Sequence, residues 1–219
     1  MANRIDVKNI CAIVLAGGRG SRMGGVDKGL QLFRGVALAK NAMLRLQNQS
    51  LGPPGKMAFN ANRNQEIYAQ WGAPVWPDAM ENFPGPLAGF LTGLQRCHET
   101  PPSSNYVLTV PCDSPLFPLD LIERLATALL EQSADIALAS APELDANGEV
   151  IMRAQPVFCL MKSDLHQSLL SFVDAGGRKI RAWTGQHKEV LVRFDTQQDS
   201  PSAFLNVNSL AELHQLELE

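Results

Sequence analysis

The 219-residue sequence has no long hydrophobic run. Its longest apolar stretch, Ile10 to Ala16, is far shorter than the ~18 residues that a membrane-spanning helix needs. The stretch continues into Gly17-Gly18-Arg19 without the small-residue cleavage pattern of a signal peptide. We therefore expect no membrane partner and a cytoplasmic location.

The chain also has little excess of either charge, because 19 Lys and Arg residues nearly balance 22 Asp and Glu residues and leave a formal net charge of −3. A mildly acidic chain has no global electrostatic reason to bind a nucleic-acid polymer or an anionic membrane. Disorder is not expected either, because 45% of the residues are hydrophobic and only 19% are charged. The composition predicts an ordinary soluble globular protein.

The cysteines form no closely spaced pair of the C-x-x-C kind; they are Cys11, Cys97, Cys112 and Cys159. The four histidines likewise show no metal-ligand spacing. We therefore expect neither a zinc site nor a disulfide framework, and the cysteine pattern favours a reducing compartment.

Short apolar segments alternate with longer helical patterns along the chain. The predicted strands are 10–15, 56–60, 74–76, 106–110, 135–139, 156–161 and 189–194, and the predicted helices are 37–47, 64–71, 87–98, 119–131 and 164–175. Buried strands separated by helices indicate βαβ units and a mostly parallel sheet. Because no repeat or low-complexity linker is visible, we predict one α/β domain over residues 1–219, a Rossmann-like three-layer fold with helices flanking the sheet. Asp145-Ala-Asn-Gly148 is typical of a hairpin turn near the sheet edge.

A glycine-rich segment, Leu15-Ala-Gly-Gly-Arg-Gly-Ser-Arg-Met-Gly-Gly-Val-Asp-Lys28, follows the first predicted strand. In open α/β sheets ligands bind at the carboxyl ends of the strands, and successive backbone N–H groups can form an anion-binding nest. The clearest basic cluster of the chain coincides with this segment: Arg19, Arg22, Lys28 and Arg34, against Asp27 alone. The segment therefore predicts a polyphosphate ligand.

Two familiar phosphate motifs do not match this segment. A Walker P-loop requires Gly-Lys-Ser/Thr, but Lys28 lies between Asp27 and Gly29. The fingerprint G-x-G-x-x-G also fails, because counting from Gly18 and Gly20 reaches Met23. A surface loop with incidental charges is the alternative interpretation.

The pattern L-A-G-G-x-x-x-R-M-G-G-x-D-K-G-L resembles the opening signature of the molybdenum cofactor guanylyltransferases, a branch of the nucleotidylyltransferase superfamily. Further matches occur in chain order, at Asn60-Ala-Asn-Arg63, Asp78, Phe83-Pro-Gly-Pro-Leu-Ala-Gly89, Val110-Pro-Cys-Asp113 and Asn206-Val-Asn208. The chain departs from the pattern at Arg34-Gly-Val-Ala37 and at Gln155-Pro156.

The resemblance implies transfer of GMP from GTP to the terminal phosphate of molybdenum-molybdopterin, with release of pyrophosphate. It implies Mg²⁺ as cofactor and transient contacts with cofactor-assembly proteins and molybdoenzyme clients. The N-terminal part would bind the nucleotide, and the C-terminal part would contribute to acceptor binding. The implied catalytic residues are Arg22, Lys28 and Asp113, with Asp113 also the metal ligand. The implied nucleotide-binding residues are Leu15, Ala16, Gly17, Gly18, Lys28, Asn60, Asp78 and Asp113, and the implied acceptor-binding residues are Gly85, Asn206 and Asn208.

Each of these residues also has a purely structural interpretation. Asp113 precedes Ser and Pro and could cap the next helix, and Asn206 and Asn208 could end a strand and cap the last helix. Asn60 and Asp78 are common turn residues, and Gly85 between prolines could be a rigid turn. Cys112 is expected to be a small buried residue, because no activating His accompanies it.

Two other functions remain open from the sequence. One is a cytidylyl or sugar-phosphate nucleotidylyltransferase, and the other is a nucleotide-binding regulator without transferase activity. A second basic spot, Gly176-Gly-Arg-Lys-Ile-Arg181, could reach an acceptor phosphate or could be a solvated helix start.

Overall fold

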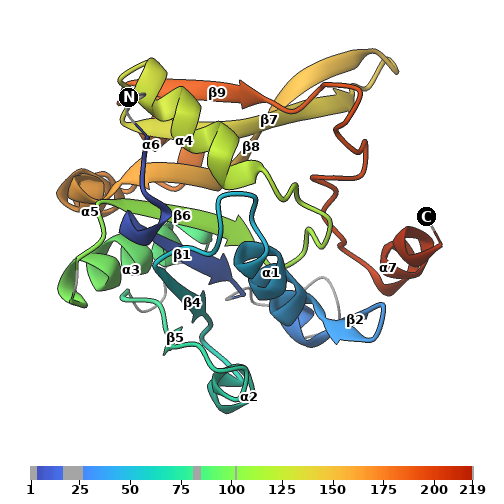
Figure 1. The fold of residues 1–219 in the computed structure, drawn as a ribbon, viewed down its shortest axis with the longest axis horizontal. Helices are drawn as coiled ribbons and strands as arrows, with labels where there is room; N and C mark the ends of the chain where they lie inside the picture. Colours follow the sequence, from blue (N-terminus) through green and yellow to red (C-terminus); the bar gives the residue numbers. More distant parts are fainter. Residues whose placement is uncertain (1–3, 17–26, 81–84, 102, 219) are drawn as a thin grey trace.

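A seven-stranded sheet forms the centre of the computed structural model, which describes residues 4–16, 27–80, 85–101 and 103–218 (Figure 1). Its strand order is β5-β4-β1-β6-β8-β7-β9. The strands are β1 (Ile10–Leu15), β4 (Lys56–Asn60), β5 (Val75–Trp76), β6 (Tyr106–Pro111), β7 (Ile136–Leu144), β8 (Val150–Lys162) and β9 (Glu189–Arg193). All neighbouring pairs are parallel except those that involve β8, which runs antiparallel to β6 and β7. The predicted α/β class with a mostly parallel sheet is confirmed.

Helices cover both faces of the sheet. They are α1 (Leu38–Gln47), α2 (Gln65–Ala69), α3 (Pro86–Glu99), α4 (Leu121–Glu131), α5 (His166–Asp174), α6 (Ile180–Thr184) and α7 (Leu210–Glu217). Alternate residues of β1 explain the layers: Ala12 and Val14 belong to the core cluster with α1 and α4, whereas Cys11 and Ile13 belong to the cluster with α3, α5 and α6. A strand that is covered on both faces has apolar residues at every position, so its sequence is an uninterrupted apolar run. This is why Ile10–Leu15 could be located from the sequence.

Some short elements were not expected from the sequence, whereas the predicted hairpin is present. The antiparallel pair β2 (Leu32–Phe33) and β3 (Val36–Ala37) and the five-residue helix α6 were not predicted, because they are too short to show a period. The turn at 145–148 does join β7 to β8, and Asp145 N donates to Glu149 O. β9 is the edge strand and pairs with β7, so the β7–β8 hairpin lies near the sheet edge, as predicted.

A disulfide joins Cys11 of β1 to Cys97 of α3, and both residues are fully buried. The sequence expectation of reduced cysteines is therefore wrong for this pair. The 86-residue separation hid the pairing, since the two residues meet only when α3 packs on the sheet. Cys112 and Cys159 are free and buried, as expected for Cys112.

A third, smaller core cluster brings the end of the chain beside its beginning. Phe33, Leu38, Val207, Leu213 and Leu216 pack together there. In Figure 1 the red helix α7 accordingly lies next to the blue strand β2, apart from the main sheet. This packing brings residues 206–208 into contact with Lys28 and Asp113.

Candidate functional site at the carboxyl edge of the sheet

The carboxyl ends of β1, β4 and β6 meet at one edge. Leu15 pairs with Asn60 on one side and with Pro111 on the other. Just beyond, Ala16 N donates to Asn60 O at 2.9 Å, and Cys112 N donates to Leu15 O at 3.1 Å. The structure thus places the ends of three predicted strands, and the polar residues that follow them, at a common edge.

Lys28 connects two segments that are far away in the sequence. Its Nζ donates to Asp113 Oδ2 at 2.6 Å and to Asn208 Oδ1 at 3.1 Å. The side chains of Lys28 and Asp113 are each 22% exposed, so the pair lies at the surface of the edge and is open to a ligand. The structure therefore brings together three of the predicted site residues: one cation, one carboxylate and one amide.

Lys28 lies in a short 3-10 turn, η3 (Lys28–Leu30), that Asp27 caps. Asp27 Oδ1 accepts from Gly29 N at 3.1 Å and from the Tyr68 hydroxyl at 2.8 Å, and Asp27 Oδ2 accepts from Asn64 Nδ2 at 2.8 Å. A carboxylate with three donors is well fixed, so the backbone beside Lys28 is fixed as well.

The segment 206–208 is tied to the strand end that carries Asp113. Val207 N donates to Asp113 O at 2.8 Å, and Ser114 Oγ donates to Asn206 Oδ1 at 2.7 Å. Helix α7 is capped by Ser209, whose hydroxyl accepts from Glu212 N. The structure thus rejects helix capping as the role of Asn206 and Asn208.

Asp113 is not a helix cap either. Helix α4 begins at Leu121, with Asp120 at the N-cap position. The carboxylate of Asp113 is instead directed to Lys28. Asp113 thus lies beside Lys28 after the end of β6, and not at the start of a helix.

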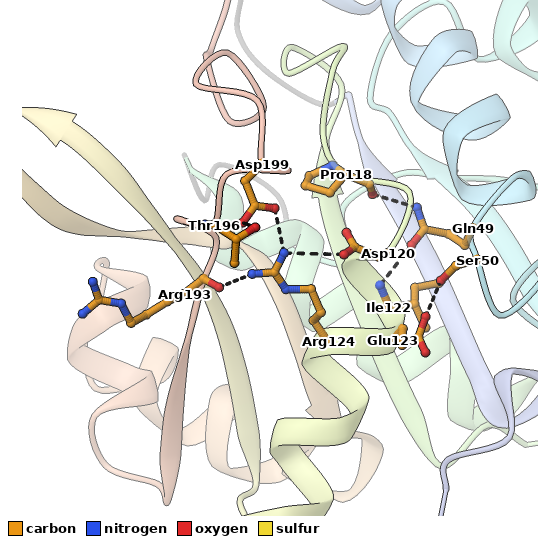
Figure 2. Close-up of polar contacts among 10 residues, drawn as sticks. All are labelled: Gln49, Ser50, Pro118, Asp120, Ile122, Glu123, Arg124, Arg193, Thr196 and Asp199. Carbon is orange, nitrogen blue, oxygen red and sulfur yellow. Dashed lines mark hydrogen bonds and ion pairs between the residues drawn. The ribbon is translucent and has the colours of Figure 1, made fainter.

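Arg124 of α4 anchors the chain that returns from β9 toward the site (Figure 2). Its guanidinium donates to Asp199 Oδ1 at 2.7 Å and to the carbonyl of Arg193, and it lies 3.8 Å from the centroid of the Phe194 ring. The side chain of Asp199 is only 8% exposed, so this ion pair is largely shielded from water. Arg124 therefore holds the start of the segment that ends in Asn206 and Asn208.

Asn60 and Asp78 meet on the β4 side of the edge. Asn60 is buried, and its Nδ2 donates to Asp78 Oδ1 at 2.9 Å and to Trp76 O at 3.1 Å. Asn62 holds Asp78 from the other side: its Nδ2 donates to Asp78 Oδ2 at 2.6 Å, and its Oδ1 accepts from Asp78 N at 2.7 Å. Each carboxylate oxygen has a further lone pair for a ligand.

Helix α3 packs closely against the side chain of Asn60. A Cβ at Gly89 would lie 2.5 Å from Asn60 Oδ1, so only glycine fits there. Gly85 is the N-cap of α3 with φ of 119°, and a Cβ there would meet no atom of the described residues within 4 Å. Gly85 is thus required for its backbone conformation, and the space beside it is open.

The structure does not test the place of four sequence-predicted residues, and it places Arg34 elsewhere. Gly17, Gly18, Arg19 and Arg22 lie outside the described residues. Arg34 lies in the β2–β3 turn, where its guanidinium faces the Phe33 ring at 5.0 Å and its backbone N donates to Glu217.

The second basic spot and Gln155 contact other groups. Arg181 pairs with Glu189 at the amino end of β9, the opposite end of the sheet from Asp113, so this spot does not join the site. Gln155 Nε2 donates to Glu143 Oε1 at 2.6 Å.

Asn62 and Asp27 are functional candidates that the sequence patterns alone do not single out. Asn62 lies two residues after Asn60, and a period of two places both on one side of an extended chain, so the spacing in Asn60-Ala-Asn62 was the available signal. In the sequence, Asp27 stands out only as the one acidic residue within the basic cluster. The partner that fixes it, Tyr68, is 41 residues away and had no local signal.

A divalent metal at this edge would rely on Asp113. No group of three His, Cys, Asp or Glu side chains within the described ranges could hold a metal on its own. The oxygen-rich neighbourhood of Asp113, with the amide oxygens of Asn206 and Asn208, does suit a hard cation that also binds phosphate oxygens. Cys112 is unsuited to nucleophilic chemistry, because burial raises the pKa of its thiol far above the usual range.

Fold and site together define an α/β protein in which a lysine, a carboxylate and several amide side chains gather at the carboxyl edge of the sheet, the place where ligands bind in open α/β sheets. The family model described as MobA-like NTP transferase domain matches residues 12–190. The chain is 54% identical to the molybdenum cofactor guanylyltransferase of Albidiferax ferrireducens, an alignment that covers 97% of this chain and 98% of the relative. It is 56% identical to the protein of the same name from Acidovorax sp. strain JS42, with 97% of each chain covered. The chain belongs to the MobA-like NTP transferase family.

Solved structures agree on the fold. Molybdopterin-guanine dinucleotide biosynthesis protein A from Archaeoglobus fulgidus superposes with a TM-score of 0.72 at 16% identity, covering 95% of this chain and 97% of that one. The 4-diphosphocytidyl-2C-methyl-D-erythritol synthase from Anaerococcus prevotii superposes with a TM-score of 0.69 at 13% identity, covering 98% and 96%. Across the described part of the chain, no helix combines the length and apolar character that crossing a bilayer requires.

Proposed function

We propose that this protein transfers GMP from GTP to the terminal phosphate of molybdenum-molybdopterin, forming the guanine dinucleotide form of the molybdenum cofactor and releasing pyrophosphate. The observation that carries the proposal is the contact of Lys28 with both Asp113 and Asn208, which lie 85 and 180 residues further along the chain. The full-length relatives at 54% and 56% identity carry the name of this activity.

The reaction joins two phosphate groups, so its main barrier is charge repulsion and positioning. A terminal phosphate oxygen of the pterin attacks the α-phosphorus of GTP, a new P–O bond forms, and the bond to the pyrophosphate leaving group breaks. The attacking oxygen is already anionic, so no general base is needed. Cations and oriented backbone N–H groups lower such a barrier.

Lys28 neutralises the triphosphate in this proposal. Its ammonium group already has two oxygen partners at the edge, so it is aimed before the nucleotide arrives. Arg22 supports the phosphate charge during transfer, and the backbone of Leu15, Ala16, Gly17 and Gly18 lies against the nucleotide. These roles follow from the position of the segment after β1 and from the family signature.

Asp113 would hold Mg²⁺ together with phosphate oxygens, and the ion would supply charge neutralisation at the transferring phosphate when bound. Lys28 would then exchange its contact with Asp113 for one with the triphosphate. Asn206 and Asn208, held by Ser114 and Lys28, line the side from which the acceptor phosphate approaches. Gly85 lies where the open space beside α3 allows the acceptor to come close.

Asn60 and Asp78 would contact the guanosine. A carboxylate that accepts from both the ring N–H and the amino group of guanine is the natural discriminator against adenine, and Asp78 is held rigidly by two asparagine amides. Transient contacts with cofactor-assembly proteins and client molybdoenzymes, and a cytoplasmic location, complete the proposal.

Selectivity for base and acceptor tests the proposal. Purified protein is given intact molybdenum-molybdopterin and Mg²⁺ with GTP, CTP or ATP, and separately GTP with a sugar phosphate, and release of pyrophosphate is measured. We expect turnover only with GTP and the pterin acceptor. Preference for CTP, or turnover with the sugar phosphate, would instead support the sugar-nucleotide or cytidylyl alternative. Tight nucleotide binding without turnover would support a regulator.

A further inference from the structure

Tyr68 lies outside the edge of the sheet but reaches it through its hydroxyl group. The residue is fully buried in α2. Its ring packs edge-on against Trp71, at 5.2 Å between centroids, and in a tilted arrangement against Phe59, at 5.5 Å. Phe59 belongs to β4 and directly precedes Asn60. A tyrosine this deep in an aromatic cluster could be a phenylalanine for packing alone, so its hydroxyl requires an explanation.

The hydroxyl donates to Asp27 Oδ1, the oxygen that also caps the turn at Lys28. Burial, and then the bond to Asp27, raise the pKa of the phenol, so the hydroxyl keeps its proton at neutral pH and donates to the carboxylate. Gly29 fits against this hydroxyl so closely that a Cβ there would lie 2.3 Å from it. The Tyr68 hydroxyl can therefore reach Asp27 only because residue 29 is a glycine.

Asn64 supports the same carboxylate from the start of α2. It occupies the N-cap position with a left-handed backbone (φ 51°), yet its side chain makes no capping bond to the helix. Its amide donates to Asp27 Oδ2 instead. The side chain of an N-cap asparagine normally accepts a hydrogen bond from a backbone N–H of its helix. The Asn64 side chain instead binds Asp27, so it stabilises that carboxylate and not the start of α2.

We infer that Tyr68 is a positioning residue for Lys28: through Asp27 it fixes the turn that aims the ammonium group of Lys28 at the nucleotide phosphates. The inference rests on the proposed phosphate-binding role of Lys28. Nothing in it requires Tyr68 to touch the nucleotide. It assigns to α2, a short helix apart from the strand ends, a part in GTP binding.

The test is a double-mutant cycle with Tyr68→Phe and Lys28→Met, in which the Kd for Mg²⁺-GTP is measured by calorimetry for all four proteins. We expect Tyr68→Phe to weaken GTP binding about fivefold when Lys28 is present, since one hydrogen bond to a charged group is lost. In the Lys28→Met background the same change should have less than about a twofold effect. Tyr106→Phe removes the only other tyrosine hydroxyl, at the far end of β6, and should leave binding unchanged.

Steady-state kinetics supply a second readout that loss of folded protein would not imitate. Tyr68→Phe should raise the KM for GTP and leave the KM for the acceptor unchanged, whereas partial misfolding would lower kcat alone. This measurement decides the matter if Lys28→Met binds GTP too weakly for calorimetry.

The outcomes separate this inference from the proposed function. An equal effect of Tyr68→Phe in both backgrounds, or no effect on the KM for GTP, overturns the positioning role and leaves the role of Lys28 intact. Unchanged GTP binding by Lys28→Met removes Lys28 from the nucleotide site, and the positioning role of Tyr68 falls with it.

Discussion

Asp113→Asn should change the affinity for GTP in opposite directions with and without Mg²⁺. Without metal, the Asp113 carboxylate holds Lys28 at 2.6 Å and repels the triphosphate, so its removal frees the lysine. A pair that is 22% exposed on both sides is worth about 1–2 kcal/mol after screening, which corresponds to about five- to thirtyfold tighter metal-free binding of GTP. With Mg²⁺, the variant lacks a carboxylate ligand and should bind GTP weaker by on the order of tenfold.

Calorimetric titration of GTP, once in excess chelator and once in saturating Mg²⁺, measures both effects. Asp120→Asn is the matched control, because it removes the same charge at the N-cap position of α4, where the partner of Asp120 is Arg124 at 3.5 Å. The control should change neither affinity. Weaker binding by Asp113→Asn in both conditions would refute the reasoning, because the carboxylate would then be favourable to the nucleotide without a metal.

Three further predictions concern the scaffold. Gly29→Ala should destabilise the protein by about 1–3 kcal/mol in urea unfolding, because the added methyl group would lie against the Tyr68 hydroxyl. In a Tyr68→Phe protein, which lacks this hydroxyl, the loss should be smaller. Equal losses with Tyr68 and with Phe at this position would contradict the packing. Reduction of Cys11–Cys97 should lower the free energy of unfolding by up to about 4.5 kcal/mol, and an unchanged melting temperature would count against the bond. Arg124→Ala should cost about 1–3 kcal/mol by leaving the carboxylate of Asp199, which is 8% exposed, without its cation. A loss below about 0.5 kcal/mol would refute its anchoring role.

The fold was predictable from sequence where an element is long and buried on a continuous face. The boundaries of 10–15 and 56–60 agree with β1 and β4, because their apolar runs end sharply at polar or glycine residues. β8 is much longer than its predicted core of 156–161, since its first half is largely exposed and its apolar start, 150–152, is separated from that core by Arg153 and Gln155. That the domain is a single unit stays a prediction.

The site was predictable to the extent that its residues follow strand ends. Lys28, Asp113 and Asn208 could be named from motifs, but their mutual contact depends on the packing of α7 against β2, which no local pattern encodes. Asn62 had a local signal in its spacing from Asn60. Tyr68 had none, because its role appears only once α2 is folded against the turn at Asp27. The roles of Arg22 and the glycines before it stay predictions.

The position of the label in the product tests nucleotidyl transfer most directly. GTP labelled either at the α-phosphorus or at the γ-phosphorus is incubated with the protein, Mg²⁺ and intact molybdenum-molybdopterin, and the pterin product is isolated. We predict that the product carries the α-label and the guanine base, and that the γ-label leaves entirely with pyrophosphate. A product that carries the γ-label, or a verified acceptor that gains no label from either nucleotide, would contradict the proposed activity.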